Sequence, residues 1–431
     1  MNPGVLPTVI TMADYAQVRG FTETLAAPLS PEDQQVQSMP DVSPTKWHRA
    51  HITWFFETFL LMPFLDGYQE FDPQFQYLYN SYYETVGERC PRDERGLISR
   101  PSATEVGEYR RHVDAAMEQL IATVAADDPK VRDLVVLGLH HEQQHQELLL
   151  MDIKHVLSKN PIRPRYHSVD RLPLAGVDPL RWVRFEGGIV EVGHPHDDAG
   201  FHFDNELPRH RQFVESFELA DRPVTNGEWL EFMADGGYHE HQHWLSAGWG
   251  TIQTENWEAP MYWEATESGW HMHTLHGFQP VNPDEPVCHV SYFEADAYAR
   301  WAGARLPTEF EWEHAVADAP MTGNLAPAGR YHPAPAHPQD DASLRQLFGD
   351  VWEWTSSSYG PYPGFSPAEG AVGEYNGKFM VNQYVLRGGC CATPGGHIRP
   401  TYRNFFPTHS RWMFSGLRLA RSVATNPPES P

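Results

Sequence analysis

The feature that most restricts the fold of this chain is a polar, histidine-rich run that leads directly into an apolar one. Residues 140–147 read HHEQQHQE, and residues 148–151 read LLLM. The run indicates part of one long helix. We expect this helix to begin at Asp128-Pro129, an N-cap residue followed by the proline favoured at the first helical position, and to continue to about Lys159. At 1.5 Å per residue it would be about 45 Å long, a length suited to a helical bundle.

Two histidines of this run, His141 and His145, would lie one turn apart on the same helical face. That spacing suits two imidazoles that bind one metal ion, and Gln144 leans toward the same side. The pair alone is weak evidence, because most histidines on amphipathic helices bind no metal. With Glu142, the letters also match the HExxH motif of zinc hydrolases. A zinc-dependent hydrolase is therefore an alternative that this motif leaves open.

The length, net charge and composition of the chain limit the kinds of molecule that it is expected to bind. The chain has 431 residues, enough for two or three domains, and a formal net charge of -25. Its pI near 5.3 argues against nucleic acid or an anionic membrane as the main partner. We see no secretory leader and no apolar run near the roughly 20 residues that span a bilayer. Four cysteines are too few for a disulfide framework, so we expect a cytoplasmic protein. Nothing in the sequence fixes its oligomeric state.

The apolar periodicity divides the chain into two parts. The first, 1–170, reads as four helices that form a bundle, with Ser43 or Thr45 as a possible cap of the second helix and a long functional loop at 64–100. Composition typical of a linker follows near 160–180. The second part, 180–425, contains short strands, many turns and a few short helices. The expected helices are 11–27, 45–60, 103–126 and 129–159 in the first part and 294–302 in the second; the expected strands lie within 185–193, 384–389 and 415–419.

Motifs of the second part resemble the formylglycine-generating-enzyme or sulfatase-modifying-factor fold, an irregular α+β domain of C-type-lectin-like type. The motifs that carry the resemblance are RPVTN at 222–226, RLPTEFEWE at 305–313, GDVWEWT at 349–355, RGG at 387–389 and GLR at 416–418. The first part resembles a DinB-like four-helix bundle. We therefore expect a two-domain α+β protein, and the fusion resembles the nonhaem-iron sulfoxide synthases of ergothioneine biosynthesis over nearly the whole chain.

The resemblance also implies the metal and its third ligand. In that family the metal is Fe(II), held by the two histidines of HxxxH and by one histidine of the second bundle helix, which corresponds here to His51. His48 lies three residues away on a similar face, so the choice of His51 rests on the resemblance. Three neutral imidazoles leave coordination positions open for a thiolate and O2.

The activity that the resemblance implies is O2-dependent joining of the sulfur of cysteine or γ-glutamylcysteine to hercynine (Nα-trimethylhistidine), with oxidation to a sulfoxide. Both substrates carry carboxylates, which arginine binds well. The family positions assign the thiol substrate to Arg92 and Arg95, and Gln144 to the imidazole of hercynine. They assign Asn404 to its betaine end, where aromatic faces suit a trimethylammonium. The candidate aromatic residues are Phe405, Phe406 and Trp412.

The chain departs from the family pattern at two points. Asn404-Phe405-Phe406 stands where the commonest pattern is Asn-Trp-Asp, and the loss of the acid favours free cysteine as sulfur donor. A family tyrosine that acts as proton donor is expected shortly after the Pro-Gly-Phe at 363–365, and residues 366–370 contain none. We predict that Tyr82 or Tyr83 takes this role, although both also read as ordinary packing aromatics.

The adjacent pair Cys390-Cys391 offers another alternative. Related oxidases that make formylglycine bind copper through a cysteine pair, but adjacent cysteines cannot easily bind one ion linearly. Buried small hydrophobic residues are the favoured interpretation. A copper-dependent formylglycine-generating oxidase is thus a weak alternative, and a non-enzymatic module that binds a thiol or a metal is another.

Overall fold

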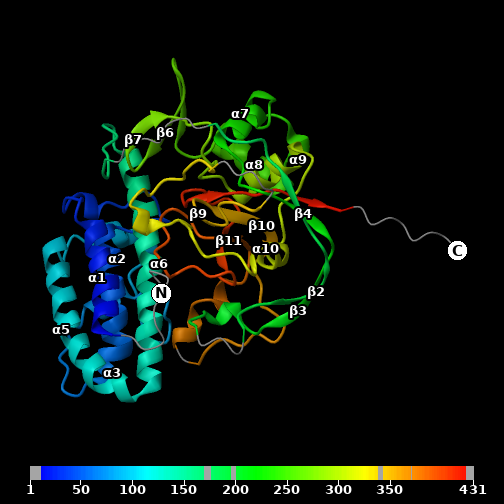
Figure 1. Cartoon of the computed structure of the whole chain (residues 1–431). Helices are drawn as coiled ribbons and strands as arrows, with labels where there is room; N and C mark the ends of the chain where they lie inside the picture. Colours follow the sequence, from blue (N-terminus) through cyan, green and yellow to red (C-terminus); the bar gives the residue numbers. More distant parts are fainter. Residues whose placement is uncertain (1–10, 169–175, 196–199, 338–342, 370, 424–431) are drawn as a thin grey trace.

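The protein was analysed as a computed structural model that describes residues 11–168, 176–195, 200–337, 343–369 and 371–423 (Figure 1). An upright group of helices lies beside a larger body of short strands and helices. The predicted domain limits at 170 and 425 lie outside the described residues. Among the described helices none is long and apolar enough to cross a membrane.

The four expected helices of the first part are present. They are α1 (Met12–Ala26), α2 (Thr45–Phe56), α5 (Ala103–Asp127) and α6 (Pro129–Lys159). Asp128 caps α6 through its side chain and Pro129 occupies the first turn, as predicted. The expected cap of α2 is wrong, because its N-cap is Pro44, which makes no side-chain cap. Ser43 has other partners: its backbone N–H donates to Asp152, and its hydroxyl accepts from Arg95.

Two parts of the bundle were not expected. The second helix continues from α2 through a π-helical turn, η2 (Glu57–Leu61), into α3 (Met62–Phe64). The segment expected as a loop at 64–100 contains α4 (Phe75–Tyr79) and a 3-10 helix, η3 (Arg92–Leu97). π-Helical turns inside α-helices are frequent at functional sites, and this one directly follows the helix that carries His51.

The second part consists of small sheets and short helices. Its largest sheet has the order β12 (Asn404–Pro407), β11 (Gln383–Arg387), β10 (Trp352–Ser358), β13 (Ser415–Gly416). The other sheets are β1 (Trp182–Phe185), β4 (Phe217–Ala220) and β14 (Ala420–Ser422); β2 (Gly188–Val192) and β3 (His210–Val214); β5 (Trp263–Thr266), β6 (Gly269–Thr274) and β7 (Gly277–Pro280); and β8 (Gly323–Asn324) and β9 (Phe348–Gly349). The α-helices are α7 (Asn226–Ala234), α8 (Ser246–Glu255), α9 (Tyr292–Trp301) and α10 (Glu309–Val316). The 3-10 turns of this part are η4 (Asp204–Glu206), η5 (His241–His243), η6 (Ala326–Ala328), η7 (Ala371–Glu374) and η8 (Gly377–Phe379), whereas η1 (Asp33–Gln35) lies in the first part.

Two strand expectations differ in detail from the structure. The run 185–193 is divided at Glu186-Gly187, because β1 pairs with β4 whereas β2 pairs with β3. A Cβ at Gly187 would lie 2.4 Å from the carbonyl oxygen of Val214, so this turn requires glycine. The run 415–419 is a strand only at its first two residues. Beyond it, the buried Arg418 forms an ion pair with Glu353.

The long helix α6 belongs to two hydrophobic cores. Its first half contributes Val131, Val135 and Leu139 to the core of the bundle. Its second half contributes Leu149, Leu150, Met151, Ile153, Val156 and Leu157 to a larger cluster, which joins the second domain to Leu25, Leu29 and Val42 of the first part. Residues 140–147 lie at the junction, where His140, Gln144 and Glu147 contact side chains of the second domain.

Candidate metal centre

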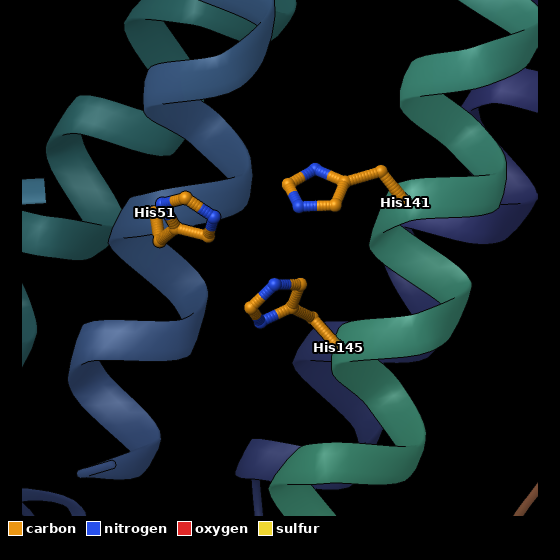
Figure 2. Close-up of side chains that lie close together, drawn as sticks. All are labelled: His51, His141 and His145. Carbon is orange, nitrogen blue, oxygen red and sulfur yellow. The ribbon is translucent and has the colours of Figure 1, made fainter. Parts of the chain in front are cut away.

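Three histidines meet between α2 and α6. One nitrogen each of His51, His141 and His145 lies within 4.8 Å of the others, and all three side chains are buried. Figure 2 shows the rings facing one another, one from α2 and two from successive turns of α6. Among the described residues this is the one such group of three or more histidine, cysteine or acidic side chains. The structure thus brings together the three residues that the sequence predicted as ligands, and metal binding itself stays a prediction.

Contacts of His51 and His141 leave ring nitrogens available. The Nδ1–H of His51 donates to the backbone carbonyl of Tyr79 at 2.6 Å, and within the described chain its Nε2 has no hydrogen-bond partner. Neither ring nitrogen of His141 has a partner among the described residues. Buried polar atoms are nearly always paired, so unpaired nitrogens facing one another indicate a ligand. A metal-binding histidine usually donates its other N–H to a carbonyl or carboxylate, as His51 does.

His48 is not part of the cluster and contacts it from behind. Its Nδ1 lies 2.9 Å from Nδ1 of His145, and its Nε2 lies 3.0 Å from a carboxylate oxygen of Asp152. The preference for His51 over His48 therefore agrees with the geometry. The sequence did not reveal the supporting contact between His48 and His145, because the two residues lie on different helices.

Burial keeps the cluster uncharged at neutral pH. It lowers the pKa of His141 to about 4 and holds the pKa values of His51 and His145 well below the ordinary value. Neutral imidazole is the form that binds metals. Three neutral nitrogens without an anionic ligand therefore fit a divalent metal such as Fe(II) or Zn(II) that keeps open coordination positions.

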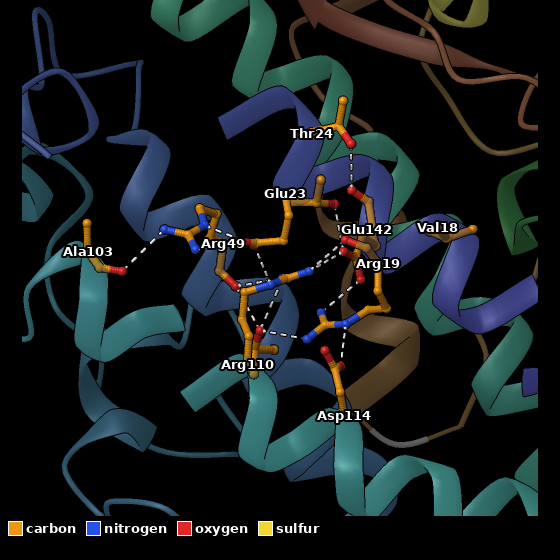
Figure 3. Close-up of polar contacts among 12 residues, drawn as sticks. Val18, Arg19, Glu23, Thr24, Arg49, Ala103, Arg110, Asp114 and Glu142 are labelled. Carbon is orange, nitrogen blue, oxygen red and sulfur yellow. Dashed lines mark hydrogen bonds and ion pairs between the residues drawn. The ribbon is translucent and has the colours of Figure 1, made fainter. Parts of the chain in front are cut away.

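Glu142, the acidic residue of the HExxH letters, lies among charged side chains of the bundle, beside Arg19 and Arg110 (Figure 3). Its carboxylate accepts from Arg19 at 2.9 Å, Arg110 at 3.1 Å and Thr22 at 2.6 Å. The two arginines offset the effect of burial and lower its pKa. A fully buried, ion-paired carboxylate cannot act as general base for a metal-bound water. The zinc hydrolase alternative thus lacks its base.

Of the two arginines predicted for the thiol substrate, Arg95 is buried and Arg92 is exposed. Arg95 stacks on Trp47 at 3.5 Å and donates to Ser43 and Ser81. No carboxylate lies within ion-pair distance of it in the described chain, its Nε has no partner, and burial lowers its pKa to about 9. Arg92 donates to the backbone carbonyl of Asp41.

Gln144 is oriented by a residue of the second domain. Its amide nitrogen donates to the hydroxyl of Tyr402 at 2.9 Å, and that hydroxyl also contacts His397 at 3.2 Å. The amide oxygen of Gln144 is therefore left as an acceptor. Tyr402 lies in the segment 402–406 that the resemblance assigns to hercynine, but no role was predicted for this tyrosine itself.

The residues predicted for the betaine end do not form a single group. Successive side chains of β12 point to opposite faces of the strand. Phe405 stacks on Tyr359, with ring centroids 4.0 Å apart, whereas Phe406 packs against Trp412, with ring centroids 5.6 Å apart. Asn404 accepts from the backbone N–H of Phe405. Trp412 uses its indole N–H on Asp152, at 3.1 Å.

Tyr82 and Tyr83 lie together near the junction of the domains, with hydroxyl groups 3.4 Å apart. Tyr375 packs on Tyr82 with ring centroids 5.2 Å apart. Burial raises the pKa of Tyr375 to about 12 and those of the other two as well. Sequence reasoning missed Tyr375, because the search for a tyrosine after Pro-Gly-Phe ended before it. The segment is fastened to the bundle by Glu374, which accepts from the hydroxyl and backbone N–H of Thr85.

Cys390 and Cys391 are fully buried free thiols. Burial raises both pKa values, and Cys390 contacts the hydroxyl of Thr393 rather than open solvent. Both side chains belong to the hydrophobic core of the second domain. Their environment is that of buried small hydrophobic residues, and protonated thiols are poor copper ligands.

Comparison with known proteins adds an independent line of evidence. The DinB superfamily matches residues 14–149, and the sulfatase-modifying factor enzyme 1-like domain matches residues 178–423. The hercynine oxygenase of Mycobacterium tuberculosis is 36% identical over 408 residues, which cover 89% of this chain and 92% of that protein. The hercynine oxygenase of Mycolicibacterium smegmatis is 35% identical, with 90% of this chain and 93% of that protein covered.

The second domain has relatives of its own. The formylglycine-generating enzyme of Streptomyces coelicolor is 29% identical over 248 residues, which cover 48% of this chain and 77% of that protein. The two matching families confirm the expected fold class, a DinB-like bundle fused to an α+β domain of the formylglycine-generating-enzyme type. Together with identity above 30% along nearly the whole length, they show that this chain belongs to the hercynine oxygenase family.

Proposed function

We propose that this protein catalyses O2-dependent C–S bond formation between hercynine and free cysteine, which gives hercynyl-cysteine sulfoxide in ergothioneine biosynthesis. Fe(II) would be held by His51, His141 and His145. The observation that carries the proposal is the buried group of three neutral imidazoles, two of them with unpaired nitrogens, in a chain of the hercynine oxygenase family. Iron, when bound there, would supply the site that binds O2 and the thiolate. The residues around it would bind the two substrates, orient them and donate a proton.

The thiol substrate would bind through its carboxylate at Arg95. A buried guanidinium without an acidic partner is costly, and a carboxylate from the substrate would offset that cost. Stacking on Trp47 and bonds to Ser43 and Ser81 hold the guanidinium in place. Arg92, which is exposed, would contribute long-range attraction rather than a direct contact. Phe406 in place of an acid leaves no charged contact for the α-amino group of γ-glutamylcysteine, which supports free cysteine as donor.

Hercynine would lie against Gln144. Because Tyr402 accepts from the amide nitrogen, the amide oxygen is free to accept the N–H of the substrate imidazole and to set its orientation. Asn404 would contact the betaine end. The trimethylammonium would lie on aromatic faces, for which Phe405 offers a group shared with Tyr359 and Phe379. Phe406 and Trp412 form a second aromatic surface on the other face of β12.

A tyrosine would donate the proton that directs the reaction to sulfoxide. Raised pKa values keep Tyr82 and Tyr83 protonated at neutral pH, and their hydroxyls lie within reach of each other. Tyr375, which packs on Tyr82, is the third member of this group. Single Tyr→Phe variants at the three positions test the role. The donor is the residue whose loss shifts product from sulfoxide to oxidised thiol; unchanged partition in the Tyr82 and Tyr83 variants would reject them.

We further propose domain limits of 1–170 and 180–425. A cytoplasmic location accords with four cysteines that are all free thiols, the usual state in a reducing compartment.

The deciding experiment is anaerobic reconstitution with Fe(II), followed by O2 uptake on addition of hercynine and cysteine. Uptake that needs both substrates and yields the sulfoxide supports the proposal, and steady-state rates with γ-glutamylcysteine test the donor. A hydrolase would respond to zinc without O2 uptake, and a binding module would bind ligands without turnover. A copper oxidase would require copper and a cysteine peptide. The control is His141→Gln, which leaves the set of metal ligands incomplete.

A further inference from the structure

Asp152 lies at the centre of a small hydrogen-bond network beside the histidine cluster. Three contacts end on its carboxylate, and a fourth leads on from His48 to His145. One carboxylate oxygen accepts from the backbone N–H of Ser43 at 2.8 Å and lies 3.0 Å from Nε2 of His48. The other accepts from the indole N–H of Trp412 at 3.1 Å. His48 in turn contacts His145 at 2.9 Å. All of these groups are buried.

The chemistry of the groups fixes the direction of these bonds. A carboxylate only accepts, so Nε2 of His48 carries a proton and donates it to Asp152. To bind a metal through Nε2, neutral His145 keeps the lone pair of that nitrogen free and carries its proton on Nδ1. That proton is donated to Nδ1 of His48, which accepts it. A metal-binding histidine is commonly held in this way by a carboxylate, here through one intervening imidazole.

We propose that Asp152 and His48 are positioning residues that hold His145 in the tautomer and orientation needed to bind the metal. We call Asp152, His48 and His145 the Asp152 relay. The inference rests on the proposed metal site and adds a function for residues outside it. Through Trp412 the relay reaches the second domain. Through Ser43, whose hydroxyl accepts from Arg95, it also reaches the proposed thiol site.

This assignment also changes the expected role of Trp412. An indole N–H that donates to a buried carboxylate is fixed in orientation, so Trp412 would serve the metal ligand as well as offering its face to a substrate. Docking of the second domain against α6 and orientation of His145 would then be coupled. Replacement of Trp412 by Phe removes the donor and keeps an aromatic ring.

The test compares Asp152→Asn with Glu57→Gln. Glu57 is an equally buried carboxylate of the bundle, and it accepts from Tyr68 and Tyr109 rather than from a histidine. Metal affinity is measured by titration of the folded apoprotein with Co(II) against a competing chelator. We expect Asp152→Asn to weaken binding by about 10- to 100-fold, the usual effect of losing such a support, and Glu57→Gln to leave it within about threefold. Trp412→Phe should fall between the two.

A second readout needs no metal. Long-range proton–nitrogen correlation on apoprotein with ¹⁵N-labelled histidine reports the tautomers, with His145 protonated at Nδ1 and His48 at Nε2. Asp152→Asn should change both tautomers, because the amide NH2 of asparagine is a donor and can face Nε2 of His48, where the carboxylate accepted. Wild-type affinity and unchanged tautomers in folded Asp152→Asn would overturn the relay. Absence of Co(II) binding by the wild-type protein would instead overturn the proposed metal site, while the tautomer measurement would still judge the relay.

Discussion

Single side chains at the junction owe their properties to contacts from distant parts of the chain. Helical spacing predicted His141 and His145, yet it could not separate His51 from His48, which lie on similar faces of α2. The difference comes from the carbonyl of Tyr79 behind His51 and the carboxylate of Asp152 behind His48. The helical spacing of residues in α2 carries no information about these partners, which lie on other segments of the chain. The same applies to Glu142, whose inward direction is set by Arg19 of α1 and Arg110 of α5.

Arg95→Met tests the substrate role of the unpaired guanidinium. We expect the KM for the thiol to rise by about 10- to 100-fold, because a charge-assisted contact contributes about 1.5–3 kcal/mol. The melting temperature of the substrate-free protein should hold or rise, since an uncompensated buried charge is removed. Steady-state kinetics and thermal unfolding check both effects. The matched control is Arg89→Met, which removes an arginine already paired with Glu84. Equal KM values in the two variants would contradict the role of Arg95.

Away from the metal site, the buried His273 should make the free energy of unfolding depend on pH. Burial, with the charge of Lys154, lowers the pKa of His273 to about 3. Below pH 6.5 the unfolded chain binds a proton that the folded chain does not, so the free energy of unfolding falls as pH falls toward 3. At pH 5 this loss is about 2 kcal/mol, at 1.36 kcal/mol per pH unit. His273→Gln should therefore lose less stability between pH 7 and pH 5. Urea unfolding at both values checks this, and the exposed His241→Gln should behave as wild type.

At the scale of elements, helices with local signals were predictable and irregular segments were not. Helix α6 begins directly after the Asp128 N-cap, and α9, which was expected at 294–302, begins at a side-chain capping box. Helix α10 also begins at a capping box, but no helix was expected there. The π-helical turn η2 has no comparable local signal, because it depends on how α2 packs against its neighbours. The strand run at 185–193 belongs to two sheets for the same reason, since the partners β3 and β4 decide which residues pair.

Gly138→Ala tests the close approach of α6 to α2, which sets the separation of His51 from the other two histidines. A Cβ at Gly138 would lie 2.6 Å from the ring of Phe56. We expect net destabilisation of about 1–2 kcal/mol, because overpacking by about 1–3 kcal/mol exceeds the gain of up to about 1 kcal/mol in helix propensity. Co(II) affinity should fall as well. Chemical unfolding and metal titration check the two effects.

Gly20→Ala is the matched control for that variant. Gly20 lies in α1, and a Cβ there would meet nothing within 4 Å. The same substitution should therefore stabilise the protein by about 0.5–1 kcal/mol and leave metal affinity unchanged. If Gly138→Ala were equally stabilising, α2 and α6 would not be held at their separation by this contact.

At the scale of the whole molecule, the two family modules share one helix. The apolar second half of α6 belongs to a hydrophobic cluster formed mostly by the second domain, so the bundle alone would lack most of that cluster. The sequence predicted both modules and the run at 148–151. It did not show that the run belongs to a cluster shared by both modules, since a buried apolar stretch has the same sequence pattern whatever covers it.

Residues 1–168 expressed alone should therefore fail to form a compact monomer. We expect aggregation on size-exclusion chromatography or strong binding of a hydrophobic dye, because the cluster that contains Leu149, Leu150 and Ile153 loses the members that the second domain supplies. A monodisperse, dye-free fragment with unmodified sequence would show that the bundle is independently stable.

The pairing of β4 with β14 has a consequence for synthesis of the chain on the ribosome. β14 ends at Ser422, near the last described residue, and it forms a sheet with strands made some two hundred residues earlier. Trp412, which donates to Asp152, also emerges late. A nascent chain that has already released all three histidines thus still lacks the contacts that orient His145. The order of translation would therefore delay a competent metal centre until synthesis has passed Trp412 and β14.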